Sequence, residues 1–536
     1  ATSQRIESPE LRAMTLAELQ DVARVVKQRC DSEAWTDPRN GAVLEPIEVN
    51  LYHLMFHYIS PRTSADCITL VDTTRFDYRR GHILTQLHAV SGHVIGKAEV
   101  LEDSDGSNVQ IKLLKGQFIA EEAGQASSYR MILDHDTGGL DCGTPSQVLQ
   151  ENSISYKELV SSVPTEPQWF VCHWWGEPIL DFVLCCQEHS AKRGSDKYWV
   201  CAYANRQHDL GADIGDNPND SSFRRAMVLA EGLLLVLDPS AVPFQRIWCC
   251  FELFKTVTSD KMLDIITMKQ APRLLTQKPL PNEQAIMKFL REKEFPLGVL
   301  TKGVQVRLEN GLATVEEDKD RILQSMGKQS STGSFNQDLQ EQNMDLANRR
   351  LRGYMAVAAW PRAIQKGRVL NFDKKSSEAV SLPEILKQDS DRTALEMFFS
   401  GMQEVSDRDL YHISEGLPSK LSSLSLSFEG CIAITDGGLN CLADRMSTLP
   451  LEKLVLDFGG CKLLTDASIL HLSTTLPSTL VDVSLVFALI PNISKHGAKS
   501  LADHLPASVS RLRATFRGTQ FDHQFDTIKQ LKKMTR

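Results

Sequence analysis

The chain has 536 residues, of which 42% are hydrophobic, 24% charged and 7% aromatic. This length and composition exclude a small disulfide-stapled scaffold or a disordered chain, and at about 150 residues per domain they predict roughly three or four globular domains. The 59 Lys and Arg residues against 68 Asp and Glu residues give a net charge of −9. Nucleic acid is therefore not expected as the main partner, because proteins that bind polyanions carry excess positive charge.

The sequence contains no run of about 18 uncharged apolar residues, so we expect a soluble protein without a membrane span. The first residues, ATSQRIESPELRAM, lack the apolar core of a secretory signal, although a transit peptide already removed would leave no trace. The twelve cysteines form no CxxC pair. Buried reduced thiols, in the cytoplasm or another reducing compartment, explain them better than disulfides or zinc, and no metal site is expected.

Residues 1–70 are expected to form a helical N-terminal segment. Thr15 and Glu18 make a capping box ahead of apolar residues spaced three to four apart, which is typical of an amphipathic helix that ends near Cys30. Residues 71–150 carry the β-type runs HILTQLHAV, HVIGKAEVLE and VQIKLLKGQFIAE, with a polar turn before the last run. These runs predict a small β-rich module.

Strand and helix patterns alternate between residues 169 and 268. The successive runs are WFVCHWW, EPILDFVLCCQEHSAK, YWVCAYA, SSFRRAMVLAE, GLLLVLD, PFQRIWCCFELFKTV and MLDIITM. Such alternation predicts a parallel sheet with helices on both faces, and we place this α/β domain at residues 160–310. We expect one parallel sheet of five strands, with WFVCHWW and GLLLVLD adjacent at its middle because both runs are apolar without alternation.

Residues 311–375 are expected to be a helical connector with a polar loop at 328–343. The sequence that follows this connector is repetitive. In residues 376–536, Leu424, Leu454, Val483 and Leu512 recur every 29 or 30 residues. The units LSSLSLSFEGCIAITDGGLNCLA and LEKLVLDFGGCKLLTDASILHLS resemble leucine-rich repeats, in which a strand lines one face and a helix returns along the other. We predict about four repeats, the first beginning near Leu382, with a basic C-terminal cap.

A second resemblance lies in the α/β region. The string WCCFEL at residues 248–253, preceded by SSFRRAMVLAEGLLLVLD, resembles the TIR domain (Toll/interleukin-1 receptor homology), in which a helix carries a WCxxEL string. The strings FVCHWWGEP, YWVCAYANRQ and RIWCCFE are also similar to a set of uncharacterised proteins from dinoflagellates and related algae. The TIR resemblance implies a flavodoxin-like parallel sheet. Because many TIR domains cleave NAD with the glutamate of this helix, it also implies Glu252 as a candidate catalytic residue.

The candidate site combines Glu252 with three residues at the end of the first predicted strand. Glu252 lies beside the apolar stripe of its predicted helix and one turn from Trp248, where a carboxylate could hold ribose hydroxyls as an oxocarbenium-like transition state develops. His173, Trp174 and Trp175 lie at the end of the first predicted strand, where open α/β sheets bind ligands, and two indoles could sandwich a nicotinamide or adenine ring. Packing beneath the N-terminal module is the alternative role of these tryptophans. The first strand and the loop NRQHDLGADIGDNPND depart from the usual TIR pattern.

Two functions fit this α/β multidomain protein. The first is a protein-interaction, scaffold or signalling protein, in which the repeat surface binds other proteins and the TIR-like domain self-associates. The alternative is an NAD-cleaving hydrolase that uses Glu252 and is regulated by the repeats, with NAD as substrate and no bound cofactor. An open cleft that holds Glu252 and Trp174 favours the enzyme, whereas a Glu252 side chain buried within its own domain favours the scaffold.

Overall fold

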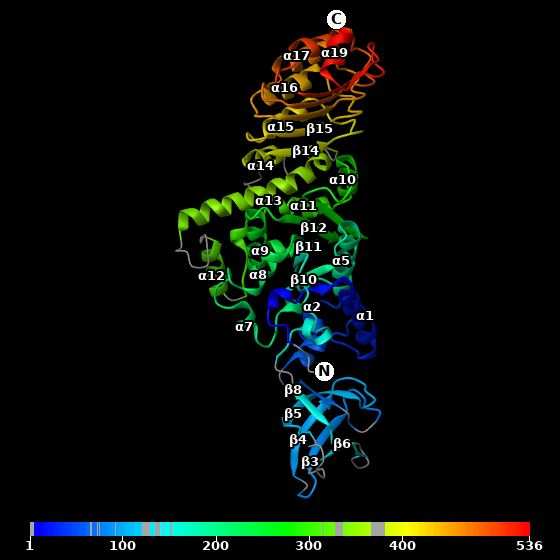
Figure 1. Cartoon of the computed structure of the whole chain (residues 1–536), viewed down its shortest axis with the longest axis vertical. Coiled ribbons are helices and arrows are strands. Elements are labelled where there is room, and N and C mark those ends of the chain that lie inside the picture. The colour runs from blue at the N-terminus through cyan, green and yellow to red at the C-terminus, as the bar shows by residue number, and fades with distance from the viewer. Residues whose placement is uncertain are drawn as a thin grey trace. The chain divides into compact units, whose positions relative to one another are not determined.

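The computed structural model describes the chain except residues 1–4, 65–66, 72, 74–75, 92, 121–128, 135–139, 143, 151–152, 315, 327–335, 366–380 and 536. The described part is a mixed α/β protein with three sheets (Figure 1). It forms two compact units, one up to Val236 and one from Leu237 onward. In this described part, no helix is both long enough and apolar enough to cross a membrane.

The N-terminal helix begins at the predicted capping box. The Thr15 hydroxyl accepts a hydrogen bond from the Glu18 N–H at 3.2 Å, and the Glu18 carboxylate accepts one from the Thr15 N–H at 2.7 Å. This helix, α1 (Leu16–Ser32), buries its apolar stripe, as the spacing predicted. The neighbouring short elements are η1 (Pro9–Leu11), α2 (Leu51–Leu54), η2 (Met55–Ile59) and α3 (Ser60–Thr63).

The sheet formed by residues 67–150 is antiparallel. The three predicted β-runs are confirmed as β3 (Ile83–His88), β4 (Val94–Val100) and β5 (Asn108–Gly116). The other strands are β2 (Cys67–Val71), β6 (Tyr129–Asp134), β7 (Leu140–Asp141) and β8 (Gln147–Gln150), and the sheet order is β7-β6-β3-β4-β5-β2-β8. Alternate residues of the strands pack into one core that includes Leu84, Val100 and Ile111.

The α/β region contains a six-stranded sheet of order β1-β10-β9-β11-β12-β13. Strand β9 (Trp169–Cys172) lies between β10 (Lys197–Val200) and β11 (Gly232–Leu237) and runs parallel to both, so the predicted pairing of the two apolar runs is confirmed. Every residue of β9 and β11 is buried, as their unbroken apolar sequence requires. The expectation of a wholly parallel sheet is wrong at the edges. There, β1 (Met14–Thr15) is antiparallel to β10, and β13 (Pro272–Thr276) is antiparallel to β12 (Met262–Met268).

Helices account for most of the remaining described residues between 156 and 365. They are α4 (Tyr156–Val160), α5 (Ile179–Arg193), α6 (Cys201–Ala204), α7 (Leu210–Ile214), α8 (Ser222–Leu229), η3 (Val242–Gln245), α9 (Ile247–Thr258), α10 (Ala285–Glu292), α11 (Leu297–Gly303), η4 (Leu308–Asn310), α12 (Glu316–Met326) and α13 (Gln337–Gln365). Helix α13 begins inside the segment 328–343 that we expected to be a loop. Its first turns are polar but consist largely of Gln, Asp, Leu and Glu, most of which are good helix formers, so polarity alone did not indicate a loop. Residues 328–335 of that segment lie outside the described residues.

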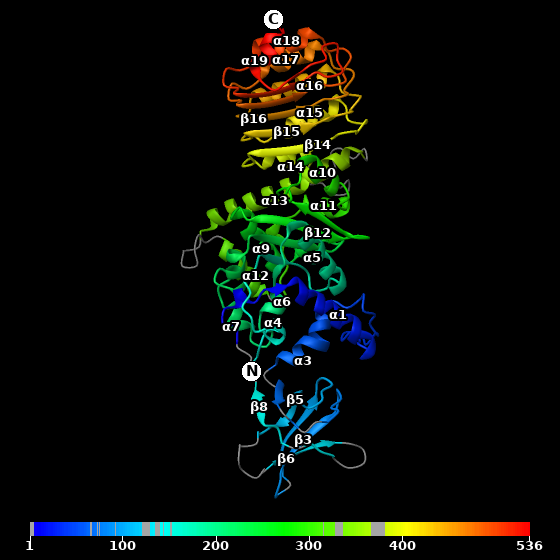
Figure 2. The same ribbon diagram turned by 45° about the vertical axis from the view of Figure 1, so that its right-hand side comes forward.

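The C-terminal sheet is a regular array of strand and helix units (Figure 2). After α14 (Leu382–Gln388), the strands β14 (Ala394–Phe398), β15 (Ser423–Ser427), β16 (Lys453–Asp457), β17 (Asp482–Val486) and β18 (Arg511–Thr515) pair in chain order, all parallel. Leu424 pairs with Leu454 and Leu454 with Val483, which confirms the predicted register. The array has five parallel strands, one more than the predicted number of repeats, and the antiparallel β19 (Gln524–Phe525) follows them.

The helices of this array lie between its strands in sequence. They are α15 (Asp407–Gly416), α16 (Asp436–Ser447), α17 (Asp466–Thr475) and α18 (Lys495–His504), with α19 (Ile528–Thr535) at the end. One buried phenylalanine per unit follows each strand and stacks on the next, with ring centroids 5.1 to 6.1 Å apart, in the order Phe399, Phe428, Phe458, Phe487 and Phe516. This column of rings fills the interior from one end of the array to the other.

All twelve cysteines are free thiols and ten of them are buried, as expected for reduced core residues. Two of them belong to the repeated array. The Cys431 thiol donates to the Phe399 carbonyl, and the Cys461 thiol donates to the Phe428 carbonyl, both at 3.2 Å. Each thiol thus joins one unit to the preceding one, which gives a structural reason for the 30-residue offset between the two cysteines.

Candidate functional site

Glu252 lies on α9, whose apolar residues define the buried side of the helix. Ile247, Cys250, Phe251 and Phe254 recur at helical spacing and all are buried, and α12 and α13 pack against this helix. Glu252 is also buried, with 4% of its surface exposed, while Trp248 is half-buried with its ring 6.1 Å from that of Phe251. The candidate catalytic carboxylate is therefore enclosed within the domain rather than presented on a helix flank.

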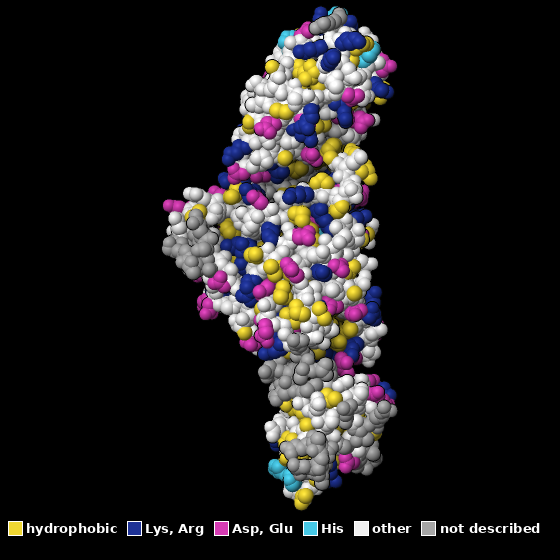
Figure 3. Space-filling view, in the orientation of Figure 1, with side chains coloured by type: hydrophobic (Ala, Val, Ile, Leu, Met, Phe, Trp, Pro, Cys, Tyr) yellow, Lys and Arg dark blue, Asp and Glu magenta, His cyan; other side chains and the backbone are white. Residues whose placement is uncertain are grey.

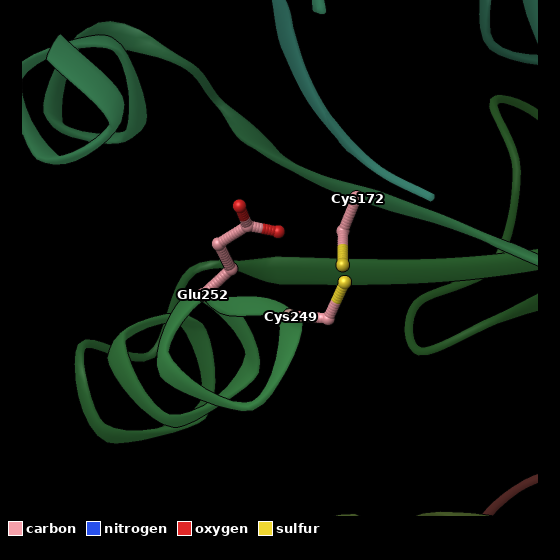
Figure 4. Close-up of side chains that lie close together, drawn as sticks. All are labelled: Cys172, Cys249 and Glu252. Carbon is pink, nitrogen blue, oxygen red and sulfur yellow. The ribbon is translucent and has the colours of Figure 1, made fainter. Parts of the chain in front are cut away.

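Two thiols accompany this carboxylate. Cys249 precedes Glu252 by about one turn of α9, and the ligand atoms of Cys172, Cys249 and Glu252 all lie within 4.8 Å of one another (Figure 4). Thiolate and carboxylate are zinc ligands, and three protein ligands suit a zinc site that keeps one open position. The sequence predicted no metal site because Cys172 and Cys249 are far apart in the chain and belong to no CxxC pair.

The adjacent Cys250 has a different environment. Its thiol donates to the Phe244 carbonyl at 3.5 Å, and burial raises the pKa of this thiol well above its ordinary value. A Cβ atom at Gly311 would approach both this sulfur and the backbone of Ile247, so only a glycine fits beside the start of α9. Cys250 is consequently a core residue that stays protonated.

The three candidate ligand-binding residues follow β9 directly. His173 is buried and its ring lies 4.6 Å from that of Phe182 on α5. The ring of Trp174 lies over Gly176, where an added Cβ would collide with the indole. Trp175 lies 5.5 Å from the ring of Tyr52, and its carbonyl accepts a hydrogen bond from the Leu51 N–H at 2.9 Å. Trp175 thus packs against the segment at residues 49–52 and Trp174 against the turn that follows it, which favours the packing role that we considered for the two tryptophans.

No model of a known protein family matches this chain, and no curated protein sequence matches it.

The outward side of the parallel strands β15 to β18, which we name the strand face, is the second candidate site. Residues of these strands alternate between a buried inner row, such as Leu424, Leu454 and Leu485, and an outer row that reaches solvent. The outer positions are Ser423, Ser425, Lys453, Val455, Asp457, Asp482, Ser484, Val486, Arg511, Arg513 and Thr515. Sequence reasoning found the inner row by its period but singled out no residue of the outer row, because these positions share no residue type.

Positive charge gathers toward the C-terminal end of the strand face. Arg511 and Arg513 are 73% and 70% exposed at their side chains, and their ion pairs with Asp482 at 3.3 Å and with Asp526 at 3.7 Å are surface pairs of small energy. Lys453 on β16 is exposed as well. Figure 3 shows dark-blue Lys and Arg side chains near the C-terminus of the chain. The result is a basic edge on a protein whose net charge is −9.

Proposed function

We propose that this chain is a protein-interaction or scaffold protein, and that residues 382–536 are a leucine-rich-repeat solenoid whose strand face binds an acidic surface of a partner protein. The observation that supports this most is the row of parallel strands in register, whose continuous outer side carries the basic Lys453, Arg511 and Arg513 beside the acidic Asp457 and Asp482. Stacked repeats build extended binding surfaces of this kind. A basic edge favours an acidic partner by charge complementarity.

The repeat assignment rests on features that recur once per unit. Each unit contributes a short strand, a buried phenylalanine and a helix, at the 29- or 30-residue period of the sequence. For the α/β region we propose a TIR-type fold that associates with further copies of itself. The parallel strands β10, β9 and β11 and the helix carrying WCCFEL support it, whereas the antiparallel edge strands are additions to a flavodoxin-like sheet.

The NAD-cleaving alternative has less support than the scaffold. A catalytic carboxylate has to contact substrate, and Glu252 is 4% exposed. Trp174 and Trp175 make packing contacts with their own neighbours. A Glu252 side chain buried within its domain was the observation that we expected to favour the scaffold.

The test is a comparison of co-purified proteins between variants. We expect the wild-type chain, expressed in cells of its source organism, to retain a set of proteins that the Arg511→Glu/Arg513→Glu variant loses. The control, Lys499→Glu, makes the same kind of charge change on an exposed residue of α18, outside the strand face, and should retain the set. Equal protein sets for all three, measured by quantitative mass spectrometry, would contradict binding through the strand face.

A further inference from the structure

The second compact unit contains a cavity of about 570 Å³, within the range of small-molecule sites. Six elements contribute to its wall: the end of α9, strands β12 and β13, helices α10 and α13, and strand β14 with the segment before it. A ligand in this cavity would therefore touch both the α/β part of the unit and its first repeat strand. The cavity is separate from Glu252, which does not line it.

One part of the wall is apolar and aromatic. Phe289 on α10 and Phe398 on β14 lie with their ring centroids 6.0 Å apart at an angle of 42°, and the side chains of Leu351 and Met397 also line the cavity. Both rings are half-buried and line the cavity, and a planar group could pair with them because aromatic rings associate well in offset or tilted arrangements. In Figure 3, yellow and dark-blue side chains lie side by side at the level where Figure 1 labels α10 and β14.

The charged part of the wall has an excess of basic groups. Seven lining residues are basic and five are acidic. Four of the acids already have an ion-pair partner: Asp260 pairs with Arg350, Glu292 with Lys288, Asp389 with Arg392, and Asp391 with Lys420. The wall therefore carries two more basic than acidic side chains. The remaining potential favours an anion.

Arg362 on α13 is the decisive residue. Its Nη1 atom is buried and makes no hydrogen bond within the described part of the chain. Burial lowers the pKa of this guanidinium, yet arginine remains charged in proteins. A charged donor without an acceptor is costly. Because Arg362 is half-buried and lines the cavity, a small shift of its guanidinium would bring this donor to an anion there.

We propose that this cavity binds a small organic anion of about nucleotide size that carries an aromatic ring, with the anionic group on Arg362 and the ring against Phe289 and Phe398. This site goes beyond the proposed protein-interaction function and does not depend on it. Neither the strand face nor Glu252 contributes to the wall of this cavity. Because the wall includes both α10 and β14, the bound anion would hold these two elements together.

The test is binding to the full chain, measured by calorimetry and by the shift in melting temperature. The probes are ADP and 8-anilinonaphthalene-1-sulfonate, each with a ring and an anionic group, together with adenosine for the ring alone and inorganic pyrophosphate for the anion alone. We expect at least one of the first two probes to bind and to raise the melting temperature more than either fragment. ADP binding without the sulfonate would identify a phosphorylated ligand, and the reverse would identify another aromatic anion.

Variants connect the binding to the cavity. Arg362→Met keeps the alkyl chain and removes the charge, so we expect it to weaken binding about tenfold or more. Arg349→Met is the matched control, because Arg349 is a half-buried arginine of the same helix that does not line the cavity. Phe289→Leu, which should also weaken binding, keeps the test decisive if Arg362→Met fails to fold. The proposal is overturned if neither aromatic anion binds, or if binding is unchanged by the variants that alter the cavity.

Discussion

An aspartate at the start of each of α15, α16 and α17 holds the start of the next helix in the array. The Asp436 carboxylate, in the first turn of α16, accepts hydrogen bonds from the Thr465 N–H at 2.8 Å and from its hydroxyl at 2.6 Å. Asp466 makes the same pair of contacts to Ser494. A carboxylate at a helix N-terminus is favoured by the helix dipole, and here it also binds the N-cap residue of the following unit. The sequence showed the 30-residue offset between these aspartates, and the contacts give its physical reason.

These hydrogen bonds predict a large effect of a single substitution. Asp466→Ala should lower the free energy of unfolding by about 2–4 kcal/mol, because hydrogen bonds to a charged acceptor contribute about 1.5–3 kcal/mol each and are not additive. Asp503→Ala, which removes an exposed aspartate of α18, is the control and should have little effect. Urea unfolding followed by circular dichroism measures both. Equal midpoints for the two variants would show that the carboxylate does not hold the repeats together.

The buried thiols of the repeats predict a reactivity and a pH dependence. Burial raises the pKa of Cys431 and of Cys461 to about 12. At pH 8, iodoacetamide should therefore modify the half-buried Cys441 well before these two residues, as mass spectrometry of the native protein would show. Unfolded thiols ionise near pH 9, so between about pH 9 and 12 the folded state binds more protons. The free energy of unfolding should fall as the pH rises through this window.

The burial of Glu252 leads to a prediction that distinguishes the scaffold from the NAD-cleaving hydrolase. If the buried carboxylate is structural, purified protein incubated with NAD will release no nicotinamide above the buffer rate, and Glu252→Gln will lower the free energy of unfolding by about 1–3 kcal/mol. Glu231→Gln, at an exposed position, should leave stability unchanged. Chromatography of nicotinamide and urea unfolding are the measurements. Release by the wild type that disappears in Glu252→Gln would instead establish the NAD-cleaving alternative.

At the scale of elements, the inner row of the repeat strands should carry much of the stability. Leu456 is fully buried on β16, whereas Leu463, after the same strand, is 52% exposed. We expect Leu456→Ala to lower the free energy of unfolding by about 2–5 kcal/mol, because the substitution leaves a cavity. Leu463→Ala should cost much less. Similar unfolding midpoints for the two variants in urea would mean that the inner row does not form the core.

Apolar runs explain why some elements could be predicted from the sequence and others could not. The runs of β9 and β11 are apolar throughout, and a strand buried on both faces requires this pattern. Strand β1 has only two residues, and its pairing with β10 depends on a contact between Met14 and Tyr198 that no local pattern reveals. YWVCAYA was predicted as one strand, yet it divides into β10 and the helix α6 after Val200. Apolar character indicated burial there, and it did not distinguish a strand from a helix.

The candidate site was also predictable only in part. The sequence placed Glu252 beside the apolar stripe of its helix, and the structure confirms that helix. It could not show that the side chain is enclosed or that it lies beside Cys172, because that cysteine belongs to β9, far earlier in the chain. Nor could it find the cavity around Arg362, whose wall comes from residues 257–398 in six separate elements. Periodicity identifies the face of one element, whereas a site requires knowing which elements meet.

At the scale of the whole molecule, charge is unevenly distributed along the chain. The net charge is −9, yet the described residues from 511 onward include six basic and two acidic side chains. A basic region on an otherwise acidic protein directs acidic partners to one end by long-range attraction, and this attraction mainly raises the association rate. The strand face and the C-terminal residues that continue it are therefore expected to bind in a salt-dependent way.

A labelled polyglutamate peptide tests this expectation on the full chain. We expect it to bind at 0.1 M NaCl and to be released at 1 M, because the Debye length falls from about 10 Å to about 3 Å over this range. Arg511→Glu/Arg513→Glu should weaken binding about tenfold or more at the lower salt concentration, since two exposed cations become anions. The control Lys499→Glu also replaces an exposed cation by an anion, but on α18, outside the strand face, and it should keep most of the affinity. Comparing it with the double variant shows whether the net charge of the protein alone determines binding. Fluorescence anisotropy measures all three proteins. If the two variants weaken binding equally per charge, the attraction comes from the protein as a whole, and the strand face is not the acidic-partner site.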